Sequence, residues 1–159
     1  MKVPENTRLR LQFLARVVNR EVHHLQSTVD RLFDASFSLE RVQQLGTLPD
    51  IAERVEAFVG RFGRLQDTLG DKLLPALLTA VGEPTSSAAD NLDKAERFQW
   101  IASADEWFSI RALRNQMVHE YVEDPVVLYS ALEAGHRFTP TLMATAHTLL
   151  NELSRRGLV

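Results

Sequence analysis

The stretch "LQFLARVVNREVHHLQSTVDRL", residues 11–32, carries the clearest periodic pattern in the chain. Its apolar side chains recur at steps of three or four residues, at Leu11, Leu14, Val18, Val22, Leu25, Val29 and Leu32. Because an α-helix has about 3.6 residues per turn, these positions form one apolar stripe along a single helix. The stretch therefore predicts a long amphipathic helix whose stripe is buried against other elements.

A second stretch, residues 51–77, repeats this spacing. Its apolar positions are Ile51, Val55, Phe58, Phe62, Leu65, Leu69, Leu73 and Leu77. The letters "LPD" at 48–50 are typical of a helix start, because proline is favoured at the first helical position. Pro75 is expected to kink or split this helix, since proline removes a backbone donor and clashes with the preceding turn.

Start signals predict two more helices downstream. The loop formers of residues 82–90, "GEPTSSAAD", include a serine that is expected to cap a short helix. That short helix carries Leu92, Ala95 and Phe98. Ser103 and Glu106 have the spacing of a capping box, so a further helix is expected to begin there and to end near Val122.

The remaining sequence predicts two helices with the same kind of start. Asp124 is expected to cap one of them, with Pro125 at its first position, and Thr139-Pro140 repeats the device to open a last helix. The inward residues of that last helix are Leu142, Ala146, Leu149 and Leu153. No stretch predicts a strand. The expected fold is all-α, an antiparallel bundle of about five helices in a single domain spanning residues 1–159.

Composition restricts the classes of function. The 159 residues are 45% hydrophobic and 25% charged, as is typical of a globular protein. The absence of cysteine excludes disulfides, thiolate metal sites and cysteine nucleophiles. The net charge of −3 means that any binding of nucleic acid must be local to one surface. The chain begins without the apolar run of a signal peptide, and its longest apolar stretch is shorter than the ~20 residues of a membrane span, so no membrane association and a cytoplasmic location are expected.

One helix end combines polar and apolar residues unusually. In "ALRNQMVHEY", residues 112–121, Arg114 falls on the same broad side as an apolar group. That group consists of Trp107, Ile110, Leu113, Met117, Val118 and Tyr121. A buried unpaired guanidinium costs several kcal/mol. Arg114 therefore needs a carboxylate partner, a wet interface or a bound anion, or it must reach the helix edge.

The polar residues of this stretch follow the pattern R-N-x-x-x-H-x-Y, as Arg114, Asn115, His119 and Tyr121. This pattern resembles the signature of HEPN domains (higher eukaryotes and prokaryotes nucleotide-binding), and especially of HepT-type toxins. The resemblance implies an all-α bundle that forms a homodimer and acts as a metal-independent ribonuclease. It implies no metal and no cofactor.

The residue types suit RNA cleavage by the neighbouring 2′-hydroxyl. His119 can transfer protons near neutral pH, which makes it the expected general base or acid. Arg114 can stabilise charge on the phosphoryl oxygens, and Asn115 can orient either the phosphate or His119. One histidine cannot assist both the attacking hydroxyl and the leaving group at the same instant. A two-fold homodimer would supply a second histidine and a second arginine. In that interpretation, the apolar side around Arg114 is shared between subunits.

Tyr121 has two interpretations. The resemblance implies an acceptor for AMP groups that are added by a cognate minimal nucleotidyltransferase antitoxin, which would block substrate phosphate. The alternative is a tyrosine packed at the interface. The expected function is a toxin-type, metal-independent endoribonuclease paired with such an antitoxin. The alternatives are a non-catalytic helical substrate-binding module that partners a nucleotidyltransferase, and a helical scaffold in which the motif is coincidental.

Overall fold

The computed structural model describes residues 2–120 and 123–159, with the side chain of Glu120 left out, and these residues form helices and connecting loops without a strand. The elements are α1 (Glu5–Leu32), α2 (Leu39–Gln43), the 3₁₀ turn η1 (Leu45–Thr47), α3 (Pro49–Asp67), the π-helical segment η2 (Thr68–Leu73), α4 (Leu74–Ala80), α5 (Ala88–Arg97), α6 (Ala104–Glu120) and α7 (Pro125–Arg155). The predicted all-α bundle is confirmed. The short helix α2 was not predicted.

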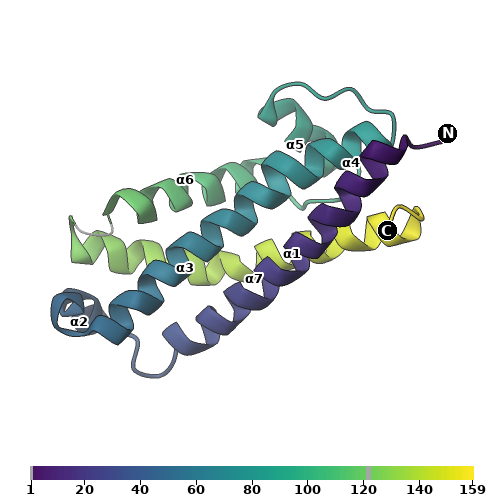
Figure 1. Ribbon diagram of the computed structural model, residues 1–159. Helices are drawn as coiled ribbons and strands as arrows, with labels where there is room; N and C mark the ends of the chain where they lie inside the picture. Colours follow the sequence, from purple (N-terminus) through teal and green to yellow (C-terminus); the bar gives the residue numbers. More distant parts are fainter. Residues whose placement is uncertain (1, 121–122) are drawn as a thin grey trace.

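The long helices lie side by side along the bundle (Figure 1). Helix α1 packs against α3, and α6 packs against α7, so that α3 lies between α1 and α6. The buried side chains of all four form one continuous core. Its largest members include Phe58 and Phe62 of α3, which lie against the leucine stripe of α1. The stripe predicted from residues 11–32 is therefore buried as expected, with Val22 only partly so.

Pro75 disturbs the helix one turn before its own position. The chain passes from α3 through η2 into α4 without a break, and the N–H of Leu74 donates to the carbonyl of Leu69, five residues earlier. This wider π-helical turn gives the proline ring room and leaves the apolar face continuous. The predicted interruption therefore takes the form of a local widening.

The prediction that Thr139-Pro140 opens a new helix is wrong. Helix α7 continues through Pro140 as one element of 31 residues. The hydroxyl of Thr139 donates to the carbonyl of Gly135 at 2.8 Å, and both residues are buried. An interior proline costs about 3 kcal/mol. Burial of Leu132 and Leu142, on either side of it, in the same core offsets this cost.

Three of the predicted helix caps are present. The side chains of Ser87, Ser103 and Asp124 accept hydrogen bonds from the backbone N–H groups of Asp90, Glu106 and Val126, respectively. These caps set the first turns of α5, α6 and α7. None of the helices among residues 2–120 and 123–159 is both long and apolar enough to cross a membrane.

Candidate functional site on helix α6

Helix α6 carries the described part of the motif. Its buried face consists of Trp107, Ile110, Leu113 and Met117, as the sequence predicts. Val118 was assigned to the same face but is half exposed. Tyr121 lies outside the described residues, so the expectations about its modification and packing are not tested. Arg114, Asn115 and His119 all lie within α6.

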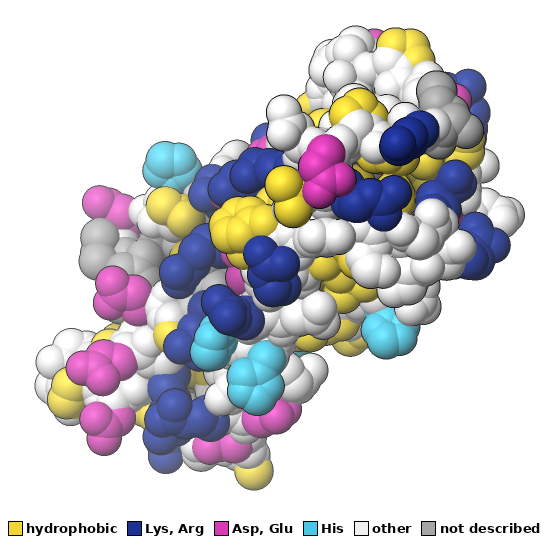
Figure 2. Space-filling model, turned by 45° about the vertical axis from the view of Figure 1, so that its right-hand side comes forward, with side chains coloured by type: hydrophobic (Ala, Val, Ile, Leu, Met, Phe, Trp, Pro, Cys, Tyr) yellow, Lys and Arg dark blue, Asp and Glu magenta, His cyan; other side chains and the backbone are white. Residues whose placement is uncertain are grey.

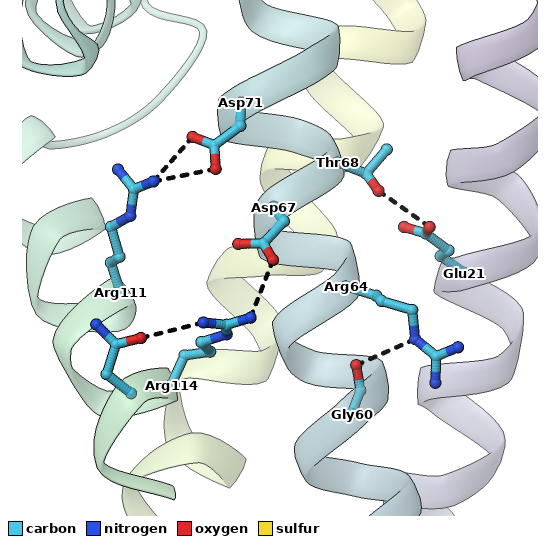
Figure 3. A network of polar contacts seen from close by, with 9 residues as sticks. Glu21, Gly60, Arg64, Asp67, Thr68, Asp71, Arg111 and Arg114 are labelled. Atoms are coloured by element: carbon cyan, nitrogen blue, oxygen red, sulfur yellow. Dashed lines mark hydrogen bonds and ion pairs between the residues drawn. The ribbon is translucent and has the colours of Figure 1, made fainter. Parts of the chain in front are cut away.

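Arg114 forms an ion pair within its own chain. Its Nη2 lies 3.2 Å from Oδ2 of Asp67, at the end of α3, and its Nη1 donates to Oδ1 of Asn115 at 3.1 Å (Figure 3). Of the possibilities open at the sequence level, the carboxylate partner is therefore the one present. The expectation that two subunits share the apolar side around Arg114 is not tested, but α3 and α7 of the same chain already cover Trp107, Ile110, Leu113 and Met117 of that side.

The aliphatic stem of Arg114 lies directly on Gly63 of α3. A Cβ atom at Gly63 would lie 3.2 Å from Cγ of Arg114, which is tight, and 2.9 Å from Nε, which is closer than real Cβ contacts allow. Nε itself is buried and has no hydrogen-bond partner. The Trp107 ring lies equally close to Gly70, where an added Cβ atom would lie 2.8 Å from Nε1 of the ring. These two glycines let α6 approach α3 and η2 closely.

A second ion pair lies beside the first. Nη2 of Arg111 is 3.1 and 3.0 Å from the two carboxylate oxygens of Asp71 in η2 (Figure 3). Both pairs are about one third exposed to solvent. Each is therefore expected to contribute about 0–1 kcal/mol to stability.

Asp67 and Asp71 were missed at the sequence level. Their spacing of four residues places both on one side of a helix, and Arg111 and Arg114 are likewise one turn apart. This is a usable signal for two matched pairs. The sequence does not say which helix each side faces, however, so it could not assign the partners.

His119 lies on the opposite side of α6 from the core. Its side chain is exposed and has no hydrogen-bond partner in the described part of the chain. Five residues separate it from Arg114, which places the two about 140° apart around the helix axis. Asn115 is only about 40° from His119 and is also exposed. The fold thus brings Arg114 to Asn115, but it does not bring His119 to Arg114 within one chain.

The outer face of α6 carries apolar side chains beside the polar ones. Phe108 is 38% exposed and Val118 is 50% exposed. Steps of four, three and four residues connect Phe108, Ala112, Asn115 and His119, so these form one exposed stripe. This exposed stripe, rather than the buried side around Arg114, is the surface of α6 that is free to meet another molecule.

No group of three or more His, Asp or Glu side chains within residues 2–120 and 123–159 is arranged to hold a metal ion. Comparison with models of protein families, with curated proteins and with solved structures finds no match to this chain.

Proposed function

We propose that the chain is a toxin-type, metal-independent endoribonuclease of the HEPN kind that works as a homodimer. One observation carries the proposal: a single helix of an all-α bundle presents both an exposed histidine, His119, and an arginine held by an ion pair, Arg114. The first suits proton transfer and the second suits phosphate.

The reaction assigns one task to each residue. A histidine takes the proton of the 2′-hydroxyl while its oxygen forms a bond to the adjacent phosphorus, and the bond from phosphorus to the 5′-oxygen breaks. The leaving 5′-oxygen takes a proton from a second acid. Arg114 and Asn115 stabilise the charge that develops on the phosphoryl oxygens. The products are a 2′,3′-cyclic phosphate and a 5′-hydroxyl.

The position of His119 favours a site composed of two subunits. Arg114 and His119 point about 140° apart around α6, so one phosphate does not easily contact both within one chain. If two α6 helices meet across a two-fold axis on the side that lies between Arg114 and His119, the histidine of one subunit can come near the arginine of the other. The exposed Phe108 and Val118 supply the apolar area that such a contact buries.

The ion pair leaves Arg114 able to bind substrate. A guanidinium has five N–H donors. One N–H of Nη2 is used by Asp67, one of Nη1 by Asn115, and that of Nε is buried, which leaves two. In this proposal, a phosphoryl oxygen takes the remaining donors or displaces Asp67.

The proposal includes a cognate minimal nucleotidyltransferase antitoxin, with Tyr121 as the acceptor of AMP. Tyr121 follows His119 by two residues at the end of the motif. A bulky anion there would compete with substrate phosphate for Arg114. The non-catalytic module that partners a nucleotidyltransferase is the second candidate, and one observation favours it: the Asp67 pair already gives Arg114 a structural role.

Purified protein incubated with RNA in EDTA tests the proposal. Cleavage is expected, with a 2′,3′-cyclic phosphate or its hydrolysis product at one new end and a 5′-hydroxyl at the other. Activity that chelation removes and magnesium restores would contradict the mechanism. Well-folded protein that never cleaves RNA, but binds a nucleotidyltransferase encoded next to it, would establish the module instead.

A further inference from the structure

The surface formed by α1 and α3 carries arginines that lack carboxylate partners. Its cationic residues are Arg10, Arg16, Arg20 and Arg31 of α1 and Arg54, Arg61 and Arg64 of α3, with Lys72 of η2 at its end. The ion pairs of the described residues use other arginines, namely Arg111, Arg114, Arg155 and Arg156. We call this surface the α1–α3 face. Figure 2 shows Lys and Arg side chains gathered over the long helices, with histidines beside them.

The distribution of charge around α3 explains this face. At 100° per residue, Arg54, Arg61 and Arg64 lie on the side of α3 that meets α1. The acidic residues Asp67 and Asp71 lie on the other side, where α6 arginines pair with them. Asp67 and Asp71 therefore pair with α6, whereas no ion pair of the described residues uses the cations that face α1. A chain of net charge −3 thus presents a local basic surface.

Two adjoining hollows lie in the groove between α1 and α3. One has a volume of about 400 Å³ and is lined by Arg31, Arg54 and Arg61, together with the acids Asp50 and Glu53. The acids belong to the first turn and a half of α3, at one end of the groove. An anion is therefore expected to enter from the arginine side of this hollow.

The second hollow has a volume of about 210 Å³ and shares Arg61 with the first. Its other lining residues are Glu21, His24 and Arg64. Thr68 donates a hydrogen bond to Glu21 at 3.0 Å, which holds one carboxylate oxygen toward η2 (Figure 3). Arg61, which reaches across to α1, therefore lies between the two hollows and borders both.

Arg61 is held in position without any ligand. Its Nη1 donates to the carbonyl of His24 at 3.0 Å and to the hydroxyl of Thr28. These two bonds use two of the five donors of the guanidinium, and the other three have no partner in the described part of the chain. A preorganised fork of this kind binds a phosphate with little further loss of side-chain entropy.

The arginines are spread over the length of a nucleic-acid strand. Arg10 and Arg31 are separated by about 30 Å along α1, at 1.5 Å per residue. The exposed rings of His23 and His24 lie between them in sequence, with their centroids 5.6 Å apart. Cations that follow a backbone, combined with rings on which bases can stack, are the features that bind single-stranded nucleic acid.

We infer that the α1–α3 face binds the phosphate backbone of a single-stranded nucleic acid, with Arg61 as its fixed central contact; that this strand is RNA rests on the proposed function. The face is separate from the motif of α6, since α3 lies between them. The inference does not depend on cleavage: a protein that binds RNA here without cutting it would satisfy it. If both proposals hold, the face retains RNA strands whose scissile phosphate reaches α6.

Fluorescence anisotropy measures this binding. The probe is a labelled oligouridylate of roughly 16 nucleotides, because single-strand binding sites extend up to about this length. All proteins carry His119→Ala, so that cleavage does not consume the probe. The test variant is Arg20→Gln/Arg31→Gln/Arg64→Gln, because these three side chains are exposed and their loss opens no cavity. Arg61→Gln is a separate variant whose melting temperature is checked first, since it loses hydrogen bonds to α1.

The matched control is Arg97→Gln/Arg155→Gln/Arg156→Gln, which removes the same charge from exposed positions on α5 and the end of α7. The test variant is expected to bind at least about tenfold more weakly at low salt, with a salt slope shallower by about two, because single-strand slopes change by about 0.7 per phosphate contact. The control is expected to change Kd less than about twofold, since it leaves the phosphate contacts in place.

Three results would overturn the inference. The first is binding by the test variant that equals that of its parent, and the second is an equal loss in the control, which would mean that only net charge matters. The third is tighter binding of a duplex of the same length than of the single strand. A loss of binding confined to the test variant and Arg61→Gln, with unchanged melting of the test variant, supports it.

Discussion

Arg114 of α6 and Asp67 of α3 form an ion pair, with Nη2 and Oδ2 3.2 Å apart, on the helix that carries the exposed His119. This pair explains why an arginine can lie beside the buried residues Ile110 and Met117 without an uncompensated charge. It also couples the candidate site to the far end of α3.

Asp67→Asn is expected to leave the fold intact and to improve substrate binding. The pair is about one third exposed, so its loss costs about 0–1 kcal/mol. A neutral amide competes less strongly with phosphate for Arg114, so KM for RNA is expected to fall a few-fold with kcat little changed. Asp71→Asn is the control, because it releases Arg111 and not Arg114. A rise in KM for Asp67→Asn would show that the carboxylate positions Arg114.

Gly63→Ala and Gly60→Ala are expected to shift stability in opposite directions. A methyl group at Gly63 meets the stem of Arg114 at 2.9 Å, and overpacking of this kind costs about 1–3 kcal/mol. At Gly60 it meets only the far end of Arg64 at 3.3 Å, so the gain in helix propensity, about 1 kcal/mol, dominates. Thermal melting of both variants compares them directly.

Repeating the Gly63→Ala substitution in an Arg114→Ala background isolates the contact between the added methyl group and the Arg114 side chain. Without the long side chain, Gly63→Ala is expected to lose most of its destabilising effect. Equal destabilisation in both backgrounds would mean that the methyl group collides with the backbone of α6 and that Arg114 plays no part.

Glu21 is expected to make the protein less stable as pH rises. Burial raises its pKa above the ordinary 4.5, while the hydrogen bond from Thr68 and the charges of Arg64 and Lys72 oppose the shift, and Asp67 adds to it. The folded state therefore prefers the protonated form. That contribution is present below about pH 4.5 and is lost as pH rises through the raised folded pKa.

Glu21→Gln removes this dependence, because glutamine stays neutral and can still accept from Thr68. The melting temperature of the variant relative to wild type is expected to rise between pH 4.5 and the raised pKa, and to stay constant above it. Glu40→Gln, at an exposed position on α2, serves as the control. A difference from wild type that does not change with pH would refute the assignment to Glu21.

Mixing two inactive variants tests the two-subunit site. A heterodimer of Arg114→Ala and His119→Ala subunits retains one arginine and one histidine on opposite chains. If these residues act across the two-fold axis, the mixture is expected to recover part of the wild-type cleavage rate, while each variant alone stays inactive. Failure to recover activity, with subunit exchange demonstrated, would show either that each site lies within one chain or that the reaction needs both histidines of the dimer.

The sequence predicted local structure well because its causes are local. The starts of α3, α5, α6 and α7 follow from proline and capping residues, and the stripe of α1 follows from helical periodicity. Pro140 was misinterpreted because packing on both sides of it, which the local pattern does not report, keeps α7 continuous.

The site was predicted less completely. The residues of the motif and the need for a partner of Arg114 were evident, but Asp67 was not, since its partner depends on how α3 rotates against α6. The close approach of the Arg114 side chain to Gly63 also depends on how α3 rotates against α6. The exposure of His119 also follows from the rotation of α6, whose outer face carries Phe108 and Val118 and therefore lacks a clear polar side.

The most direct test of the central claim compares wild-type protein with His119→Ala on RNA, with melting temperatures taken on the same preparations. His119 is exposed and makes no described hydrogen bond, so the variant is expected to melt within a degree or so of wild type, as surface substitutions usually change stability by less than about 0.5 kcal/mol. Cleavage in EDTA is expected to fall by about 10²-fold or more, the typical contribution of a general acid or base. Wild-type cleavage by a fully folded His119→Ala protein would contradict the account.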